Sequence, residues 1–240
     1  MVTKKPTRAP SLGEQLASVL RDQIVRRVIG PGTHLVEDTL AAEYDVSRGP
    51  VRDALRQLES QGLVESRRRG FYVLGLTLRD VDDLYELREA IEVVAVTRAI
   101  ELASPAQLAA GRAIVDEMIA AADRSAATDF AQADLRFHEL LYDMGGNRKL
   151  VDVWQEYKPV IASLMQLTVE EDVDLHPSAL DHARLLDLIV AGDATPLGVE
   201  LRGHLRGARS RMTHAVDAMI GGGTTDLTST PDAVAAERVS

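Results

Sequence analysis

Four polar side chains of this 240-residue chain fall where predicted helices should turn apolar side chains inward. They are Asp134, His138, His182 and His204. A buried polar group without a partner is costly, so four of them on inward helix faces need a chemical explanation. One divalent cation bound by all four would provide it, because imidazole nitrogens and carboxylate oxygens are common metal ligands. The sequence therefore predicts a metal site with three nitrogen ligands and one oxygen ligand.

The spacing of these residues favours a single shared ion. Asp134 and His138 are four residues apart, so on a helix they share one face and can bind one ion together. His182 and His204 lie on two later helical stretches and would close the site from neighbouring helices, as in metal sites inside helix bundles. The chain has no cysteine, which excludes thiolate ligands. The metals Zn²⁺, Ni²⁺ and Mn²⁺ all suit the donors that remain.

Each histidine also has a simpler explanation. A single histidine on an apolar helix face is more often a core residue that bonds a carbonyl or a carboxylate. That explanation is the better one for any of the three taken alone, but three of them with a carboxylate are harder to explain separately. The remaining histidines, His34, His176 and His214, lie in turn-like stretches or near the end of the last helix, and we assign them no function.

Length and composition limit the class of protein. A chain of 240 residues forms two modest domains more often than one. No stretch approaches the ~18 unbroken apolar residues of a membrane span. The N-terminal segment has no apolar core after its two lysines, unlike a signal peptide. Because the absence of cysteine fits a reducing compartment, we expect a cytoplasmic protein with no membrane partner.

Charge is unevenly distributed along the chain. The net charge of −10 argues against a polyanionic partner for the molecule as a whole. Residues 1–79, however, carry thirteen Lys and Arg against nine Asp and Glu, while the remainder carries fourteen against twenty-eight. A basic first third followed by an acidic remainder indicates that only the first domain meets nucleic acid.

The first third of the chain has the element order of a helix-turn-helix protein. A capping box at Ser11–Glu14 opens a helix that ends at the turn Gly30–Gly32. The apolar stripe of this helix is Leu12, Leu16, Val19, Leu20, Ile24 and Val28. A short helix over residues 37–44 and a tight turn lead to a third helix over residues 48–61, which Ser47 should cap. Two short helices joined by a few residues have helix-turn-helix spacing.

The third predicted helix has an apolar face and an arginine face. Arg48, Arg52 and Arg56 recur every four residues on the arginine face. Ser47 and Gly49 stand at its N-terminal end, which a recognition helix presents to base edges in the major groove. Arginine is the commonest bidentate reader of guanine. A solvated charged face could carry the same arginines, but it would not account for the order of elements around them.

Two short β-prone runs follow the third helix. Residues 63–65 and 71–73 flank a basic turn, which predicts a hairpin wing. The turn consists of Arg67, Arg68, Arg69 and Gly70. Its arginines would lie on phosphate or enter the minor groove.

The segment PGTHLVEDTLAAEYDVSRGPVRDALRQLESQGLVESRRRGFYV resembles the winged-helix domain of the GntR family of bacterial transcription regulators. The run DVSRGPVRDALRQLESQGLV is the specific part. The DNA-contacting residues that the resemblance implies are Arg48, Arg52, Arg69 and Gly70. Two positions depart from the family pattern. Gly49 replaces a Thr that can contact phosphate in many relatives, and Asp38 stands where some relatives have a DNA-contacting Arg.

From Thr77 onward the sequence predicts only amphipathic helices. The expected helix starts are Thr77 with Asp80, Ser104 before Pro105, Asp129 as a cap and Asn147 as a cap. The last two helices carry His182 and His204. Six helices around one core make an all-α bundle. The predicted fold is therefore mostly α, with an N-terminal winged helix-turn-helix and a C-terminal six-helix bundle.

This second part resembles the C-terminal ligand-binding domain, or FCD domain, of the FadR subfamily, and the two resemblances together cover about residues 11–219. The residues that carry it are Asp134 and His138 in DLRFH, Gly146 and Asn147, His182 in DHARLLDLI, and His204 in HLRGARSRM. The resemblance implies a metal held by the aspartate and the three histidines in an effector pocket. Relatives that lack the histidines bind acyl-CoA instead.

Arg88 is a candidate effector-binding residue. It stands on an inward stripe of the long helix with Leu84, Ile91 and Ala95. A buried guanidinium needs an anion. Glu92, one turn further along the helix, is one candidate. A ligand carboxylate held jointly by Arg88 and open metal positions is the other, and the sequence does not choose between them.

These features give an expected division of the chain and a function. We expect a disordered arm at 1–10, a DNA-binding domain at 11–76, an effector- and metal-binding domain at 77–220 and a disordered tail at 221–240. The predicted protein is a homodimeric regulator, in the simplest case a repressor, of a palindromic double-stranded DNA operator. A small carboxylate effector bound at one divalent ion would modulate its operator affinity.

Two other interpretations remain open at the level of sequence. The first is a metalloenzyme that uses three histidines and one aspartate to hold an ion with open positions. The regulator is favoured because no general base or nucleophile accompanies the four ligands. The second is that the metal itself is the signal.

Overall fold

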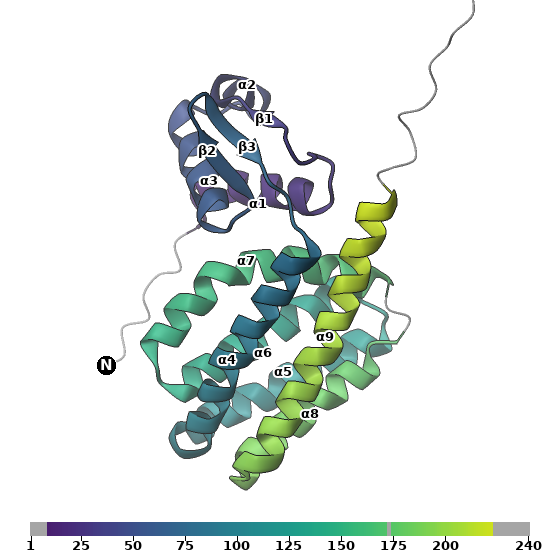
Figure 1. Ribbon diagram of the computed structural model, residues 1–240. Helices are drawn as coiled ribbons and strands as arrows, with labels where there is room; N and C mark the ends of the chain where they lie inside the picture. Colours follow the sequence, from purple (N-terminus) through teal and green to yellow (C-terminus); the bar gives the residue numbers. More distant parts are fainter. Residues whose placement is uncertain (1–8, 172–173, 223–240) are drawn as a thin grey trace, which may run out of the picture.

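The computed structural model of the protein describes residues 9–171 and 174–222. Its first part is a winged helix-turn-helix unit. Its elements are α1 (Leu12–Val25), β1 (His34–Leu35), α2 (Glu37–Glu43), α3 (Arg48–Ser60), β2 (Val64–Arg67) and β3 (Gly70–Val73). The strands form one antiparallel sheet in the order β1-β3-β2, and the β2–β3 hairpin is the predicted wing (Figure 1). Strand β1, which the sequence does not predict, pairs with Phe71 and Tyr72 of β3.

Helix α1 begins with the predicted capping box but ends earlier than expected. The Ser11 hydroxyl accepts the Glu14 N–H at 3.2 Å, and the Glu14 carboxylate accepts the Ser11 N–H at 2.6 Å. The helix stops at Val25, and Arg27 beyond it has a φ of 56°, which a right-handed helix cannot contain. The buried members of the predicted stripe are Leu16, Leu20 and Ile24, and the exposed ones are Leu12, Val19 and Val28. The predicted stripe is therefore only partly right.

Helix α3 packs an apolar face against α1 and leaves its arginine face in solvent. Val51, Leu55 and Leu58 on the apolar face are fully buried. Ser47 occupies the N-cap position in an extended conformation, but its side chain makes no capping hydrogen bond. The predicted N-cap position of Ser47 is thus confirmed, but its side chain does not satisfy the helix start. The first N–H groups of α3 are left for another acceptor, as at helix starts that bind anions.

The rest of the chain is helical, with no strand in residues 78–171 or 174–222. Its helices are α4 (Leu78–Leu102), α5 (Pro105–Asp123), α6 (Ala127–Gly145), α7 (Arg148–Glu171), α8 (His176–Ala191) and α9 (Ala194–Gly222). Helix α4 packs against α6 and α9, while α6 also packs against α5 and α7 (Figure 1). The predicted mostly-α fold with a C-terminal helical bundle is confirmed.

Most helix starts in the bundle are the predicted ones. The starts that the structure bears out are Thr77 with Asp80 on α4, Ser104 before Pro105 on α5, and Asn147 on α7. Asp129 is not a cap, contrary to prediction. Helix α6 begins two residues earlier, at Ala127, after an Ala126 that makes no side-chain cap, so Asp129 lies in its first turn. A negative side chain there still suits the helix dipole.

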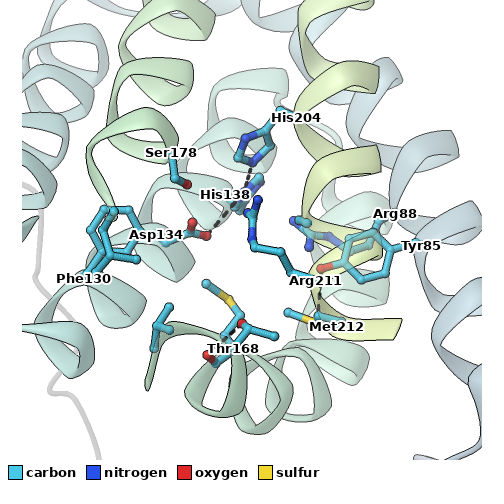
Figure 2. A pocket seen from close by; sticks show the side chains of 14 residues that line it. Tyr85, Arg88, Phe130, Asp134, His138, Thr168, Ser178, His204, Arg211 and Met212 are labelled. Carbon is cyan, nitrogen blue, oxygen red and sulfur yellow. Dashed lines mark hydrogen bonds and ion pairs between the residues drawn. The ribbon is translucent and has the colours of Figure 1, made fainter. Parts of the chain in front are cut away.

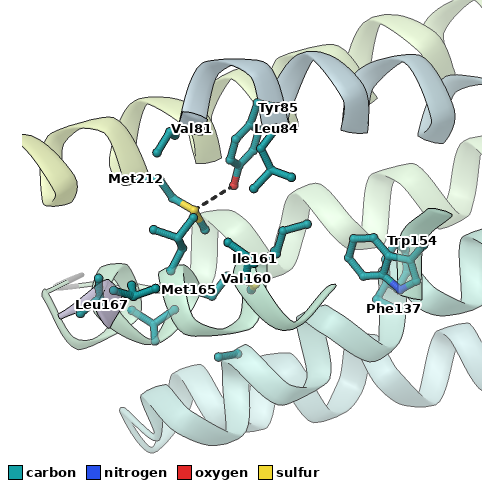
Figure 3. Close-up of a cluster of buried hydrophobic side chains, with 14 of the residues drawn as sticks. Val81, Leu84, Tyr85, Phe137, Trp154, Val160, Ile161, Met165, Leu167 and Met212 are labelled. Carbon is teal, nitrogen blue, oxygen red and sulfur yellow. Dashed lines mark hydrogen bonds between the residues drawn. The ribbon is translucent and has the colours of Figure 1, made fainter. Parts of the chain in front are cut away.

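Close packing holds α4 against α6 beside the candidate site. A Cβ added to Gly145 would lie 2.7 Å from the main-chain oxygen of Ala95, so this approach requires glycine. Arg98 Nε donates to the Gly145 carbonyl at 2.7 Å across the same contact. The bundle interior is filled with large side chains such as Trp154 and Phe137 (Figure 3). The site is therefore built on tightly packed helices.

The predicted arm and tail fall largely outside the described residues. Helix α9 continues to Gly222, so the first two residues of the predicted tail at 221–240 are helical. Within the two ranges that the structure describes, no helix combines the length and the apolar character needed to cross a bilayer.

Candidate metal centre and DNA interface

Helices α6, α8 and α9 bring the four predicted metal ligands together inside the bundle. Ligand nitrogens of His138, His182 and His204 lie within 4.8 Å of one another. Asp134 stands beside them, with Oδ1 3.5 Å from His138 Nε2 and Oδ2 3.2 Å from His182 Nε2. All four residues are buried, and Figure 2 shows Asp134, His138 and His204 close together on one side of a pocket. Residues 70 positions apart in the chain thus share one small space.

The ring of His182 is held from behind by the main chain. Its Nδ1 lies 2.7 Å from the Ser178 carbonyl oxygen, and because a carbonyl only accepts, Nδ1 carries the hydrogen. In the neutral ring, Nε2 then directs a lone pair toward Asp134. This nitrogen is buried and has no hydrogen-bond partner within the described part of the chain. Burial alone would lower the pKa of His182, but the negative charge of Asp134 outweighs it and raises that pKa.

The ring of His138 is held in the same way by Glu92 on α4. Glu92 Oε2 accepts the Nδ1 hydrogen of His138 at 2.8 Å, and Glu92 Oε1 accepts from Arg88 Nε at 2.8 Å. Burial alone would raise the pKa of Glu92, but the charge of Arg88 keeps it well below its usual range. Nε2 of His138 therefore faces the other histidines with a lone pair. Hydrogen bonds of this kind behind a histidine ring are typical of metal sites.

His204 completes the group from α9. Its Nε2 lies 3.4 Å from Nε2 of His138, and its Nδ1 lies 3.8 Å from Asp181, too far for a hydrogen bond. Burial, followed by the charge of His182, lowers the pKa of His204 to about 4. The ring is therefore neutral at neutral pH, which is the form that binds a metal.

The four side chains fit a bound cation. Nε2 of His138 and Nε2 of His204 are 3.4 Å apart, and Nε2 of His182 is 3.2 Å from the Asp134 carboxylate. Facing lone pairs at these distances repel one another unless a hydrogen or a cation lies between them. A hydrogen on Nε2 of His204 would relieve the first contact, and a proton shared by His182 and Asp134 would relieve the second. One divalent ion would relieve both, and three nitrogens with one oxygen are a suitable donor set.

A pocket opens beside the histidines. Its polar wall consists of Tyr85, Arg88, Asp134, His138, Thr168, Ser178, His204 and Arg211 (Figure 2). The sequence analysis did not single out Arg211. This residue follows His204 by seven positions, and that spacing places both on one face of α9, a signal that could have identified it. Ser178 precedes His182 by four positions on α8 and carries a similar signal, whereas Thr168 carries none, because its place on the wall depends on how α7 packs.

Arg88 has the partner on its own helix that the sequence suggested. The guanidinium and the Glu92 carboxylate form an ion pair at 2.8 Å in which both side chains are almost completely buried. Burial would lower the pKa of Arg88, but the charge of Glu92 raises it instead. The guanidinium also lies over the ring of Tyr85, 5.0 Å from the ring centre, and lines the pocket. Because Arg88 lines the pocket, a ligand bound there can reach it even though it is paired with Glu92.

The predicted DNA-contacting arginines of α3 are exposed, and two of them pair with α2. Arg48 Nε lies 2.5 Å from Asp38, and Arg52 donates to Glu37 at 3.0 Å. Arg56 is also exposed, as are Ser47 and Gly49 at the helix start. Exposed ion pairs contribute little to stability, so phosphate can replace these carboxylates at low cost. Asp38, which departs from the family pattern, engages Arg48 in the free protein.

The turn of the wing has fewer residues than the sequence predicted. Arg67 and Gly70 are paired residues of β2 and β3, so only Arg68 and Arg69 form the turn. All three arginines are exposed, and Gly70 is half-buried. His34, to which we assigned no function, donates to the Arg69 carbonyl at 2.9 Å. The contact between His34 and Arg69 depends on the pairing of β1 with β3, and no local sequence pattern indicates that pairing.

A winged helix-turn-helix joined to an all-α domain that encloses a pocket defines a class of DNA-binding transcription regulators. Comparison with known families agrees. Residues 12–73 match "Bacterial regulatory proteins, gntR family", and residues 83–207 match the FCD domain. The chain belongs to the GntR family of bacterial transcription regulators, in the branch that carries an FCD domain.

Characterised relatives are regulators as well. The "Gluconate operon transcriptional repressor" of Bacillus subtilis (strain 168) is 32% identical over 177 residues, which are 74% of this chain and 72% of that protein. The "HTH-type transcriptional repressor RspR" of Escherichia coli (strain K12) is 30% identical over 151 residues, 62% of this chain and 66% of that one. The metalloenzyme interpretation is therefore not supported.

A solved structure shares the fold. The structure "E. coli McbR/YncC" superposes with a TM-score of 0.68 at 20% identity and covers 86% of this chain and 99% of its own. At that identity the likeness concerns the fold alone.

Proposed function

We propose that this regulator is a repressor whose affinity for operator DNA changes when a small carboxylate binds beside a metal ion in the helical domain. Residues 11–76 would bind the DNA, and residues 77–220 would bind the metal and the effector. Two copies would bind one palindromic operator in the cytoplasm, since a two-fold protein reads two half-sites. Several relatives are themselves named repressors, which supports the direction of control.

One observation carries the metal part of the proposal. Three imidazole nitrogens and the Asp134 carboxylate converge, while the far nitrogens of His138 and His182 are hydrogen-bonded to Glu92 and to a carbonyl. This arrangement selects the tautomers that present lone pairs to one point. Zn²⁺, Ni²⁺ or Mn²⁺ held there would offer open coordination positions to a carboxylate.

The pocket wall supports a small anion as the effector. Two arginines, Arg88 and Arg211, line the same space as Asp134, His138 and His204. A guanidinium can bind a carboxylate through two parallel hydrogen bonds. Hydroxyl groups of Tyr85 and Thr168 add hydrogen-bonding partners for a hydroxylated ligand. The gluconate in the names of two relatives is a compound of this chemical type.

Helix α7 offers a route from the pocket to the DNA-binding unit. Met165 and Thr168 on α7 line the pocket, and Ser163 on the same helix donates to Asp22 of α1 at 2.5 Å. Helix α1 in turn packs against α3, the proposed recognition helix. A ligand that repositions α7 would therefore act on the element that carries α3.

The DNA-contacting set that we propose is Ser47, Arg48, Gly49, Arg52 and Arg56 on α3, with Arg67, Arg68, Arg69 and Gly70 in the wing. Its support is the exposure of the arginines and the family to which the chain belongs. The N-terminal end of α3 would meet base edges, and the wing would meet the backbone or the minor groove.

A gel-shift titration tests the proposal directly. The probe is the DNA upstream of the chain's own gene, with metal-stripped and Zn²⁺-loaded protein, each with and without gluconate or another small carboxylate from a panel. Release of the loaded protein by one carboxylate, and no such release of stripped protein, is the expected result. If metal removal alone changes the affinity as much, the metal is itself the signal. Equal affinity of stripped and loaded protein, with no response to any carboxylate of the panel, contradicts the proposal.

A further inference from the structure

A histidine outside the proposed DNA-contacting set is in direct contact with the wing. His34, on β1, has its Nε2 2.9 Å from the Arg69 carbonyl oxygen. Because a carbonyl only accepts, the Nε2–H of His34 is the donor. Arg69 is one of only two residues that form the turn between β2 and β3. A third strand therefore fixes the tip of the hairpin through one side chain.

The His34 ring is itself held in place by a row of side chains across the sheet. It stacks on Tyr72 with ring centres 4.5 Å apart and planes inclined by 10°. The Arg67 guanidinium lies over the Tyr72 ring, 4.7 Å from its centre. His34 and Tyr72 are directly paired residues of β1 and β3, and Arg67 lies on the neighbouring strand β2. The row thus crosses all three strands and ends on an arginine of the wing.

The backbone conformation of the turn explains why it needs the hydrogen bond from His34. Two-residue hairpin loops usually adopt turns with a positive φ at the first central residue, because those turns match the twist of the strands. Neither Arg68 nor Arg69 has a positive φ, whereas Gly70 takes a φ of 126°. A Cβ on Gly70 would lie 2.8 Å from His34 Nε2. Gly70 therefore accommodates both the unusual turn and the hydrogen bond from His34.

We propose that His34 is a positioning residue for DNA binding, which holds the main chain of Arg69 so that the wing arginines are ordered before DNA arrives. The inference rests on the proposed contact between wing and DNA. An exposed turn that is disordered in the free protein loses conformational entropy on binding, and a preorganised turn does not. His34 thereby strengthens binding without itself contacting a base or a phosphate.

Two substitutions separate the hydrogen bond from the stacking. His34→Phe keeps an aromatic ring on Tyr72 but removes the donor, whereas His34→Gln keeps an N–H donor and removes the ring. His214→Phe, at an exposed position on α9, is the matched control. Affinity is measured on a mixed-sequence duplex of about 30 base pairs over a series of salt concentrations, so that no operator is needed.

We expect His34→Phe to weaken binding about fivefold, the equivalent of one hydrogen bond, and to lower the salt slope by up to about 1. His34→Gln should stay within about twofold of the parent protein. His214→Phe should change neither quantity. The melting temperature should be nearly the same in all variants, while amide exchange at the wing turn should be faster in His34→Phe only.

Arg69→Ala makes the test decisive. Its effect and that of His34→Phe should be less than additive, because His34 acts on DNA binding only through the position of the wing arginines, of which Arg69 is one. Additive losses would mean that His34 binds DNA independently and would overturn the proposal. So would a His34→Phe variant with unchanged affinity while Arg69→Ala is weakened. If neither Arg68→Ala nor Arg69→Ala weakens binding, the proposed wing contact itself fails, and the role of His34 with it.

Discussion

His138 donates its Nδ1 hydrogen to Oε2 of Glu92 across 2.8 Å, and neither side chain is more than 2% exposed to solvent. The bond joins α6 to α4 and turns Nε2 of the histidine toward the other two imidazoles. The other oxygen of Glu92 is bound by Arg88 at 2.8 Å. One buried carboxylate therefore orients a proposed metal ligand and neutralises a guanidinium on the pocket wall.

Replacing Glu92 with Gln should weaken metal binding and stability together. The neutral amide no longer polarises the His138 ring, and loss of such a partner lowers metal affinity roughly 10- to 100-fold. Arg88 would also lose its buried counter-charge, at a cost of about 3 kcal/mol or more. Isothermal titration with Zn²⁺ and urea unfolding of the metal-free protein measure the two effects separately.

The control for this variant is Glu86→Gln, which changes an exposed carboxylate on the same helix. It should leave both quantities unchanged within error. Equal zinc affinity in Glu92→Gln and the parent protein would show that the bond to His138 does not orient a metal ligand.

Replacing His182 with Ala should abolish the stabilisation that metal provides. A ligand that binds only the folded state raises the melting temperature in proportion to its binding free energy. Addition of Zn²⁺ should therefore raise the melting temperature of the parent protein and of His214→Ala, but not of His182→Ala. Binding to DNA by the first domain should persist in all three. An equal rise in His182→Ala would remove this residue from the ligand set.

Replacing Arg48 or Arg52 with Ala should each weaken operator binding by ~1–3 kcal/mol and relax the base preference. Both side chains are exposed, and their partners Asp38 and Glu37 are on the surface as well, so the fold should be unaffected. Arg79→Ala, an exposed arginine on α4, is the control. Losses of equal size on operator and random DNA would limit these arginines to phosphate contacts.

The protein should be a homodimer on its operator. Light scattering should give twice the chain mass of 26.1 kDa for the free protein, and one dimer should bind one palindromic duplex. A mass of one chain together with one-to-one binding of a single half-site would contradict the two-fold arrangement.

Much of the candidate site could be predicted from helical periodicity alone. Asp134, His138, His182 and His204 stand on stripes whose other members are apolar, and the structure buries all four. The hydrogen bond from His138 to Glu92 could not be predicted, because it joins residues 46 positions apart on helices that only tertiary packing brings together. Glu92 was expected only as a partner of Arg88, its neighbour one turn away.

The fold could be predicted where local chemistry decides it. Capping boxes at Ser11 and Thr77 set helix starts correctly, since both partners lie within one turn. Strand β1 could not be found, because a two-residue strand has no periodicity and exists only by pairing with β3. The early end of α1 depends on the left-handed conformation of Arg27, a residue type that rarely signals it.

The metal content should fall as the pH is lowered. Imidazole binds a metal only in its neutral form, so protons compete with the ion for the three histidines. Metal retained after dialysis should therefore decrease between about pH 8 and about pH 5, with a midpoint that rises when free metal is scarcer. Retention that does not vary across this range would argue against histidine ligation.

Native mass spectrometry of the metal-stripped protein after reloading tests the central claim most directly. The parent chain should carry one divalent ion per chain from Zn²⁺, Ni²⁺ or Mn²⁺, and a variant with both His182→Ala and His204→Ala should carry none. The contradicting result is a parent chain that stays metal-free with all three ions. The three imidazoles would then be core residues, held together by a proton that His182 and Asp134 share.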